Sequence, residues 1–137
     1  METKIVVGLR NASEGVNPKD RVGSNKTDLS LVPNHALREV TKALEEGARK
    51  YGAYNWRVEP IQFRTYLAAC ARHLGACLDG EDVDPDSGLH PLTHVAASCL
   101  IVLDALNFGS LIDNRPIPKP QPADAEECHQ EAERHSS

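Results

Sequence analysis

The chain is short of aromatic residues and of long hydrophobic runs, and both shortages restrict what it can be. One tryptophan, three tyrosines and two phenylalanines stand among 137 residues, so aliphatic and small side chains must build any core. No apolar stretch approaches the roughly 20 residues that cross a bilayer. The run Ile5–Val7 is too short for a signal peptide. We therefore expect a soluble cytoplasmic protein without a membrane partner.

An excess of positive charge is also lacking, because the formal net charge is −5. A nucleic-acid-binding surface is usually basic, so we expect no nucleic-acid partner. The four cysteines form no CxxC pair, which argues against a soft-metal site, and we predict buried free thiols. They are Cys70, Cys77, Cys99 and Cys128.

Several catalytic signatures are missing as well. The sequence has no GxxxxGK[ST] phosphate loop, no GxGxxG fingerprint and no GxSxG elbow. It also has no adjacent His-Asp pair of the kind found in some metal phosphohydrolases. A covalent nucleophile therefore has no clear candidate, and attack by a metal-assisted water fits the residue inventory best.

The residues that are present predict an all-α fold in three parts. Residues 1–33 are predicted to form an extended N-terminal arm or loop, with a short strand at Lys4–Val7. Residues 34–110 form a helical domain, and residues 111–137 form a Pro-rich linker and a largely disordered acidic tail. The predicted helices, from their apolar periodicity and end signals, are Asn34–Lys50, Pro60–Gly80 and Pro91–Asn107. The third is apolar almost all round, which predicts a central position and a subunit interface.

The most informative stretch is Gly80–His94, which places four carboxylates within six positions. Crowded negative charge repels itself unless a divalent cation neutralises it, although a solvated acidic turn is the alternative. An EF-hand loop is excluded, because Thr93 stands where the bidentate glutamate should be. The pair Glu81-x-x-Asp84 suits Mg²⁺ or Mn²⁺.

Two histidines follow the carboxylates, His90 and His94. An i, i+4 pair can bind zinc, but Pro91 replaces the glutamate of an HExxH motif. A role in orienting loop carboxylates, or in contacting a phosphate at the helix N-terminus, remains equally open.

The first predicted helix adds Glu39, Glu46 and Lys50 on one stripe. A solvated face supported by the Glu46–Lys50 pair is the alternative reading of this stripe. Glu45 lies off the stripe and is interpreted as a surface residue.

Four segments together resemble the phage dATP/dGTP diphosphohydrolase family, a MazG-like all-α group of nucleotide pyrophosphohydrolases. The segments are LSLVPNHALREV, GARKYGAYNWR, YLAACARHLGA and GEDVDPDSGLHPLTHVAAS. The resemblance covers residues 17–107 and implies a helical bundle that assembles as a dimer or tetramer. It implies hydrolysis of a purine (deoxy)nucleoside triphosphate to the monophosphate and diphosphate, with preference for dGTP or GTP. The dGMP would then supply synthesis of a 2-aminoadenine nucleotide.

The resemblance also implies Mg²⁺ or Mn²⁺ held by carboxylates, about two or three ions per site. The chain departs from the EExxE pattern of MazG-like enzymes, because Arg49 stands in place of the third glutamate. Its ligand set therefore rests on chemistry rather than on direct transfer. Asp86 also stands where a glutamate would be expected in relatives.

These considerations give a set of candidate site residues. The catalytic candidates are Glu39, Glu81 and Asp84. The metal-ligand candidates are Glu39, Glu46, Glu81, Asp82, Asp84 and Asp86. The substrate-binding candidates are Lys50, Asn55, Trp56, Arg72, His73, His90 and His94, with Lys19 and Lys26 reaching from the arm of a neighbouring subunit.

Three rival functions stay open at this point. The first is a non-catalytic, oligomeric protein that senses or sequesters a nucleotide. The second is a zinc hydrolase that uses His73, His90 and His94. The third is a purely structural helical protein. For Trp56, a plug at the corner between two helices is as good an interpretation as contact with a base.

Overall fold

The computed structural model describes residue 15 and residues 17–117, which divide into two compact units. One unit ends at Leu37 and the other begins at Arg38. The first holds helix α1 (Pro18–Gly23) and a 3₁₀ turn, η1 (Leu29–Leu31). The arm was predicted to be extended, and this is wrong for α1. Pro18 at the start of the helix and Asn17, whose side chain accepts from the Lys19 N–H, are sufficient N-terminal signals.

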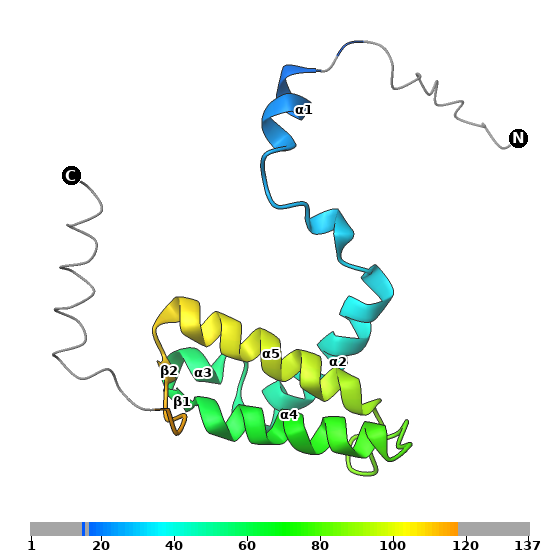
Figure 1. Ribbon diagram of the computed structural model, residues 1–137, viewed down its shortest axis with the longest axis vertical. Coiled ribbons are helices and arrows are strands. Elements are labelled where there is room, and N and C mark those ends of the chain that lie inside the picture. The colour runs from blue at the N-terminus through cyan, green and yellow to red at the C-terminus, as the bar shows by residue number, and fades with distance from the viewer. Residues whose placement is uncertain (1–14, 16, 118–137) are drawn as a thin grey trace, which may run out of the picture. The chain divides into compact units, whose positions relative to one another are not determined.

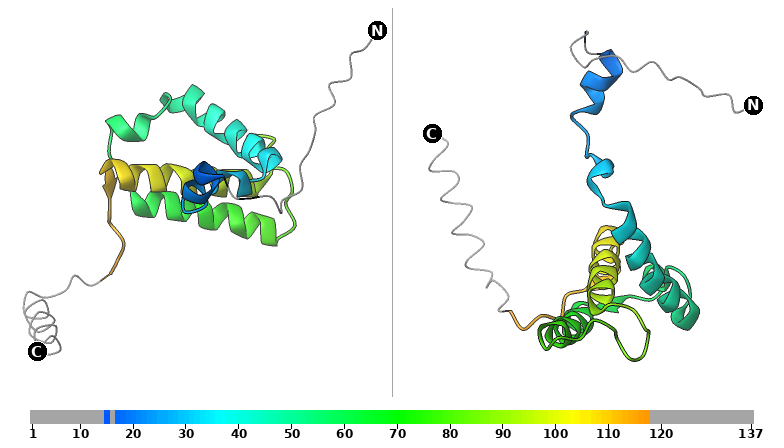
Figure 2. Two further views of the ribbon diagram at one scale, coloured as in Figure 1. Left: turned by 90° about the horizontal axis from the view of Figure 1, so that it is seen from above. Right: turned by 90° about the vertical axis from the view of Figure 1, so that its right-hand side faces the viewer.

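The second unit contains the three predicted helices, and the all-α prediction is confirmed. Helix α2 (Asn34–Tyr51), which begins in the first unit, is followed by α3 (Asn55–Val58), α4 (Phe63–Leu78) and α5 (Pro91–Phe108). Figure 1 shows α4 and α5 side by side, and they form the main packing contact of this unit. In Figure 2 the two helices again run together. The long acidic loop, residues 79–90, connects them.

The prediction missed a short parallel pairing at the far end of these helices. Strand β1 (Ile61–Gln62) pairs with β2 (Leu111–Ile112), so Ile61 lies opposite Leu111. Helix α4 therefore begins at Phe63 rather than at Pro60 as predicted. Two-residue strands are set by tertiary contact and carry too little pattern to be seen in a sequence.

Helix α5 is apolar but largely uncovered within one chain. No stretch near membrane-spanning length was expected, but by length and composition this helix is one, with a mean hydropathy of 1.4 over 18 residues, of which 22% are buried. Ala97 and Ala105 are buried on one side, whereas Leu103 is 62% exposed on the other. The predicted central position holds, since α5 contacts α4, α3 and β2. Burial on more than one side is not seen in the single chain.

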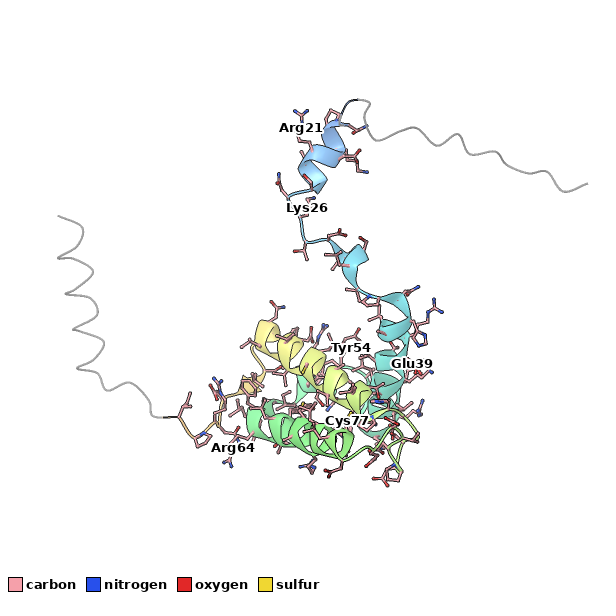
Figure 3. All side chains as sticks on the ribbon, turned by 45° about the vertical axis from the view of Figure 1, so that its right-hand side comes forward. Arg21, Lys26, Glu39, Tyr54, Arg64 and Cys77 are labelled. Atoms are coloured by element: carbon pink, nitrogen blue, oxygen red, sulfur yellow. The ribbon has the colours of Figure 1, made fainter. Side chains whose placement is uncertain are left out.

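The cysteine prediction is correct in part. Cys70, Cys77 and Cys99 are free thiols, but Cys99 is exposed and the other two are only partly buried. Cys77 lies near the end of α4 (Figure 3). Burial raises the pKa of the Cys70 thiol. The predicted strand at Lys4–Val7, Cys128 and nearly all of the predicted tail lie outside the described residues.

Candidate active site

A charged cleft opens between α2 and the end of the acidic loop. Its volume is about 450 Å³. Its walls carry three carboxylates and three cationic groups, and the complete lining is Lys42, Glu45, Glu46, Arg49, Lys50, Asp86, Ser87 and Leu89. Helical spacing brings the α2 residues to one side, because positions three and four apart are neighbours on a helix. The cleft therefore offers both hard oxygen donors and partners for an anion.

Glu46 and Lys50 form an ion pair on the wall of this cleft. The Lys50 Nζ lies 2.9 Å from the Glu46 Oε1, and the Glu46 side chain is only 19% exposed. The hydrogen bond to Glu46 raises the pKa of the Lys50 ammonium, and the charge of Asp86 adds to this effect. Lys50 is therefore held as a cation between carboxylates from two elements.

An aromatic hollow of about 200 Å³ adjoins the charged cleft, and Glu46 and Lys50 line both. It is enclosed by α2, α3, α4 and α5. Its lining is Ala43, Leu44, Glu46, Gly47, Lys50, Tyr51, Asn55, Trp56, Tyr66, His94, Ala97, Ser98 and Ile101. Small residues on α2 and α5 leave the space, while Trp56 and Tyr66 supply aromatic walls. Burial raises the pKa of the Tyr66 hydroxyl, so that group stays a neutral hydrogen-bonding partner at pH 7.

The acidic loop is organised around Asp84. Its Oδ1 accepts hydrogen bonds from the N–H groups of Asp86 and Ser87, at 2.9 and 3.0 Å. The Ser87 N–H bond is the main reason that the pKa of the Asp84 carboxyl lies below its usual value, and the charge of His94 contributes. Asp84 thus shapes the turn that carries Asp86 and Ser87 to the cleft.

Two histidines lie against this turn. The rings of His73 and His94 stack with centroids 4.7 Å apart. The His94 Nε2 lies 2.7 Å from the Ser87 Oγ, and the His73 Nδ1 lies 3.7 Å from the Asp84 Oδ2. These contacts connect α4 and α5 to the loop. An orienting role was considered for His90 and His94, whereas the ring that stacks on His94 belongs to His73.

His90 has a different local role. It is the N-cap of α5, where its Nδ1 accepts from the Leu92 N–H at 3.1 Å. Its Nε2 lies 3.6 Å from the Asp82 Oδ1. Among residues 15 and 17–117, no three His, Cys, Asp or Glu side chains gather in a group that could hold a metal ion. The zinc alternative therefore has no preformed site in the described part of one chain.

The structure brings some predicted residues together and leaves others apart. The cleft and the hollow contain Glu46, Asp86, Lys50, Asn55, Trp56 and His94. Glu39, labelled on α2 in Figure 3, pairs with Lys42 at 2.7 Å and lines neither. Six other predicted residues also line neither the cleft nor the hollow: Glu81, Asp82, Asp84, Arg72, His73 and His90. Lys19 and Lys26 line a separate hollow within the first unit.

Three residues that line the cleft were not predicted as site residues: Lys42, Glu45 and Arg49. Glu45 was interpreted as a surface residue because it lies off the stripe of Glu39 and Glu46. The cleft lies to one side of that stripe, where Lys42, Glu45 and Arg49 follow one another at spacings of three and four. That i, i+3, i+7 spacing was a signal that the sequence did carry.

The donor chemistry of the cleft fits a hard divalent cation. Carboxylate oxygens are the ligands that Mg²⁺ and Mn²⁺ prefer. Glu45, Glu46 and Asp86 supply such oxygens around one space, although they do not converge in a single chain. Water and phosphate oxygens usually complete a Mg²⁺ site, so a complete protein cage is not required.

Comparison with known proteins identifies the family. Residues 16–115 match the family model described as "dATP/dGTP diphosphohydrolase, N-terminal", and the chain belongs to this family. A dATP/dGTP diphosphohydrolase of Salmonella phage PMBT28 is 31% identical over 90 residues. That alignment covers 66% of this chain and 30% of the phage protein, so the chain spans less than a third of its relative. No solved structure matches the chain.

Proposed function

We propose that the protein is a nucleoside triphosphate pyrophosphohydrolase that converts a purine (deoxy)nucleoside triphosphate and water to the monophosphate and diphosphate. The observation that carries the proposal is the union of the charged cleft with the aromatic hollow through Glu46 and Lys50. A triphosphate needs cations and a metal, whereas a base needs a flat, partly apolar space. The name of the phage relative supports the same class of reaction for that protein.

Within this proposal the cations of the cleft bind the phosphates. Arg49 offers the bidentate fork that suits phosphate, and Lys42 and Lys50 add point charges. Glu45, Glu46 and Asp86 would hold Mg²⁺ or Mn²⁺. When bound, such ions polarise the phosphoryl oxygens and lower the pKa of the attacking water. A carboxylate not engaged by metal accepts the proton of that water.

The hollow would receive the base. Trp56 and Tyr66 provide stacking surfaces, and Asn55 and Ser98 provide hydrogen-bonding groups at the same space. Preference for dGTP or GTP, and supply of dGMP to a synthetase that leads to a 2-aminoadenine nucleotide, form the finer part of this proposal. A cytoplasmic location accompanies it.

We also propose that the working form is a homodimer or homotetramer. Leu92, Cys99, Leu103 and Leu106 lie on one face of α5 and are all exposed. They recur at spacings of seven, four and three residues, which places them on a single stripe. Association would cover this stripe. Asp104, ion-paired to Arg57, makes the same helix a poor membrane span.

The test is turnover of each dNTP and NTP by the purified full-length protein with Mg²⁺, Mn²⁺ or EDTA. Products are separated so that nucleoside monophosphate plus inorganic diphosphate is distinguished from nucleoside diphosphate plus phosphate. Metal-dependent release of diphosphate, strongest with dGTP or GTP, is the expected result. Tight nucleotide binding without turnover would instead establish the non-catalytic sensing function, and neither binding nor turnover would leave a structural helical protein.

A further inference from the structure

Asp104 is the only Asp, Glu, Lys or Arg in the eighteen residues of α5. Its Oδ2 accepts a hydrogen bond from the Trp56 Nε1 at 2.7 Å, across 48 residues of sequence. Arg57 binds the same carboxylate, with its Nε 2.8 Å from Oδ2 and a terminal nitrogen 2.9 Å from Oδ1. A charged group in an otherwise apolar helix needs polar partners. The two residues that bind this carboxylate therefore indicate what it does in the fold.

The carboxylate is itself held in place by Arg57. The guanidinium of Arg57 lies over the Tyr54 ring at 4.4 Å from its centroid and over the Phe108 ring at 5.3 Å. These cation–π contacts come from both sides of the joint between α3 and α5. Asp104 is therefore a fixed acceptor rather than a mobile surface carboxylate.

Trp56 is the residue on which this fixed acceptor acts. Its ring lines the aromatic hollow together with Asn55 and Tyr66. An indole has two side-chain torsions, and the directional hydrogen bond of Nε1 to Asp104 restricts how far the ring can turn. The orientation of one wall of the hollow thus depends on an acceptor that lies outside the lining of that hollow.

We propose that Asp104 is a positioning residue, which orients the Trp56 ring for stacking against the base of a bound nucleotide. This inference rests on the proposed function, since it requires that a nucleotide base occupies the aromatic hollow. Asp104 itself contacts neither base nor phosphate. Its effect is expected on nucleotide affinity and KM rather than on the rate of the chemical step.

The experiment is a double-mutant cycle with dGTP as the probe, followed by direct binding and by steady-state kinetics. Asp104→Ala should raise Kd and KM about two- to ten-fold, the range for ordering one freed side chain on binding, and leave kcat unchanged. Trp56→Phe keeps an aromatic face but has no N–H. In the Trp56→Phe background, Asp104→Ala should add nothing, because Asp104 acts through that N–H.

Two further variants separate positioning from a structural role. Arg57→Gln releases the hold on the Asp104 carboxylate but leaves the indole hydrogen bond able to form, so it should lower Tm and raise KM by less than Asp104→Ala does. Asp104→Asn keeps the shape of the side chain and one acceptor oxygen. It replaces Asp104→Ala in the comparison if Asp104→Ala fails to fold. Its KM should fall between those of wild type and Asp104→Ala.

The outcomes are distinguishable because Trp56 is the sole tryptophan and reports on the hollow by fluorescence. If the emission of wild type responds to dGTP but Asp104→Ala and Asp104→Asn bind as wild type does, the inference is overturned and the proposed function stands. Additive penalties in the cycle overturn it too. A wild type that binds no nucleotide overturns both.

Discussion

At the scale of single residues, the Asp104 carboxyl couples stability to pH. Arg57, and then the Trp56 N–H, lower its pKa from 3.8 to about 2. A depressed pKa in the folded state stabilises the protein above the unfolded value, and this stabilisation is lost as the pH falls through the folded value. We therefore expect the urea midpoint to fall between about pH 4 and pH 2. In Asp104→Asn this part of the fall should be absent.

Asp113 provides the matched control for that measurement. Arg115 lowers the pKa of the Asp113 carboxyl to about 2 in the same way, but within two residues of sequence. Because a local pair also forms readily in an unfolded chain, Asp113→Asn should flatten the pH dependence less than Asp104→Asn does. Equal flattening in the two variants would contradict the role given to the long-range pair.

Glu46 is the carboxylate on which cleft and hollow meet, and its neutral variant tests the proposed chemistry. Glu46→Gln keeps the size of the side chain and removes the charge that pairs with Lys50. We expect metal-dependent turnover to fall at least about 100-fold, the lower range for loss of a proton-transfer group. The far-UV circular dichroism should stay that of wild type. Glu59→Gln, at an exposed position outside cleft and hollow, should keep full turnover.

Glu39→Gln decides between two site assignments. Carboxylate chemistry on the helix stripe, weighed together with the family resemblance, predicted Glu39 as a catalytic residue, whereas the cleft is lined by Glu45 and Glu46 instead. In the cleft-based assignment Glu39→Gln loses far less activity than Glu46→Gln. The reverse order, measured under the same metal concentration, would return the site to Glu39.

At the scale of elements, the acidic loop depends on a backbone that only glycine adopts easily. Gly88 has φ 72°, and its N–H donates to the Asp84 carbonyl at 2.8 Å. A Cβ there would meet no atom within 4 Å, so Gly88→Ala adds backbone strain alone. We expect a loss of about 1 kcal/mol in the free energy of unfolding. Chemical denaturation measures it.

Gly47 is the matched position with ordinary helical geometry. It lies inside α2, and a Cβ there also meets nothing within 4 Å. Gly47→Ala should therefore raise the free energy of unfolding by about 0.5–1 kcal/mol. The two glycine-to-alanine changes should have opposite signs, and equal signs would refute the strained turn.

Periodicity predicted most of this element scale. Apolar spacing and the signals Pro91 and Gly109 placed α5 to within one residue of its observed end. Periodicity did not predict the short elements α1, α3, β1 and β2, because helices of four to six residues and strands of two residues have too few positions to show a period. The role of Asp84 in shaping the loop was not predicted either, since a sequence cannot show whether a carboxylate faces a cleft or accepts hydrogen bonds from its own turn.

At the scale of the whole molecule, the exposed stripe of α5 predicts self-association. Leu103→Glu places a charge in the middle of that stripe, where the native side chain is 62% exposed in one chain. We expect the assembly to dissociate towards monomer at a protein concentration at which wild type is a dimer or tetramer. Sedimentation equilibrium measures the mass.

Val58→Glu is the control for that change. Val58 is also an exposed aliphatic residue, at 80%, but it stands at the end of α3 and is not part of the α5 stripe. It should leave the mass of the assembly unchanged. A monomeric wild type, or equal dissociation of both variants, would contradict an interface on α5.

The site at this scale could be predicted only in part. Residue chemistry indicated Glu46, Lys50, Asp86 and the region of Asn55 and Trp56, all of which line the cleft or the hollow. Helical spacing puts Lys42, Glu45 and Arg49 on one face of α2, but it could not show that this face meets the acidic loop, because the direction of the loop relative to α2 depends on packing between elements. The partner of Trp56 lies 48 residues away, and no local pattern connects it to Asp104.

The pairing of β1 with β2 has a consequence for the connectivity of the fold. It ties the residues before α4 to those after α5, with Ile61 opposite Leu111, while the acidic loop joins the same two helices at their other end. The α4–α5 pair is thus connected at both ends, by the acidic loop at one end and by the main-chain hydrogen bonds of β1 and β2 at the other. After a single proteolytic nick in the acidic loop, we expect the two fragments to stay associated through the packing of α4 on α5 and the pairing of β1 with β2.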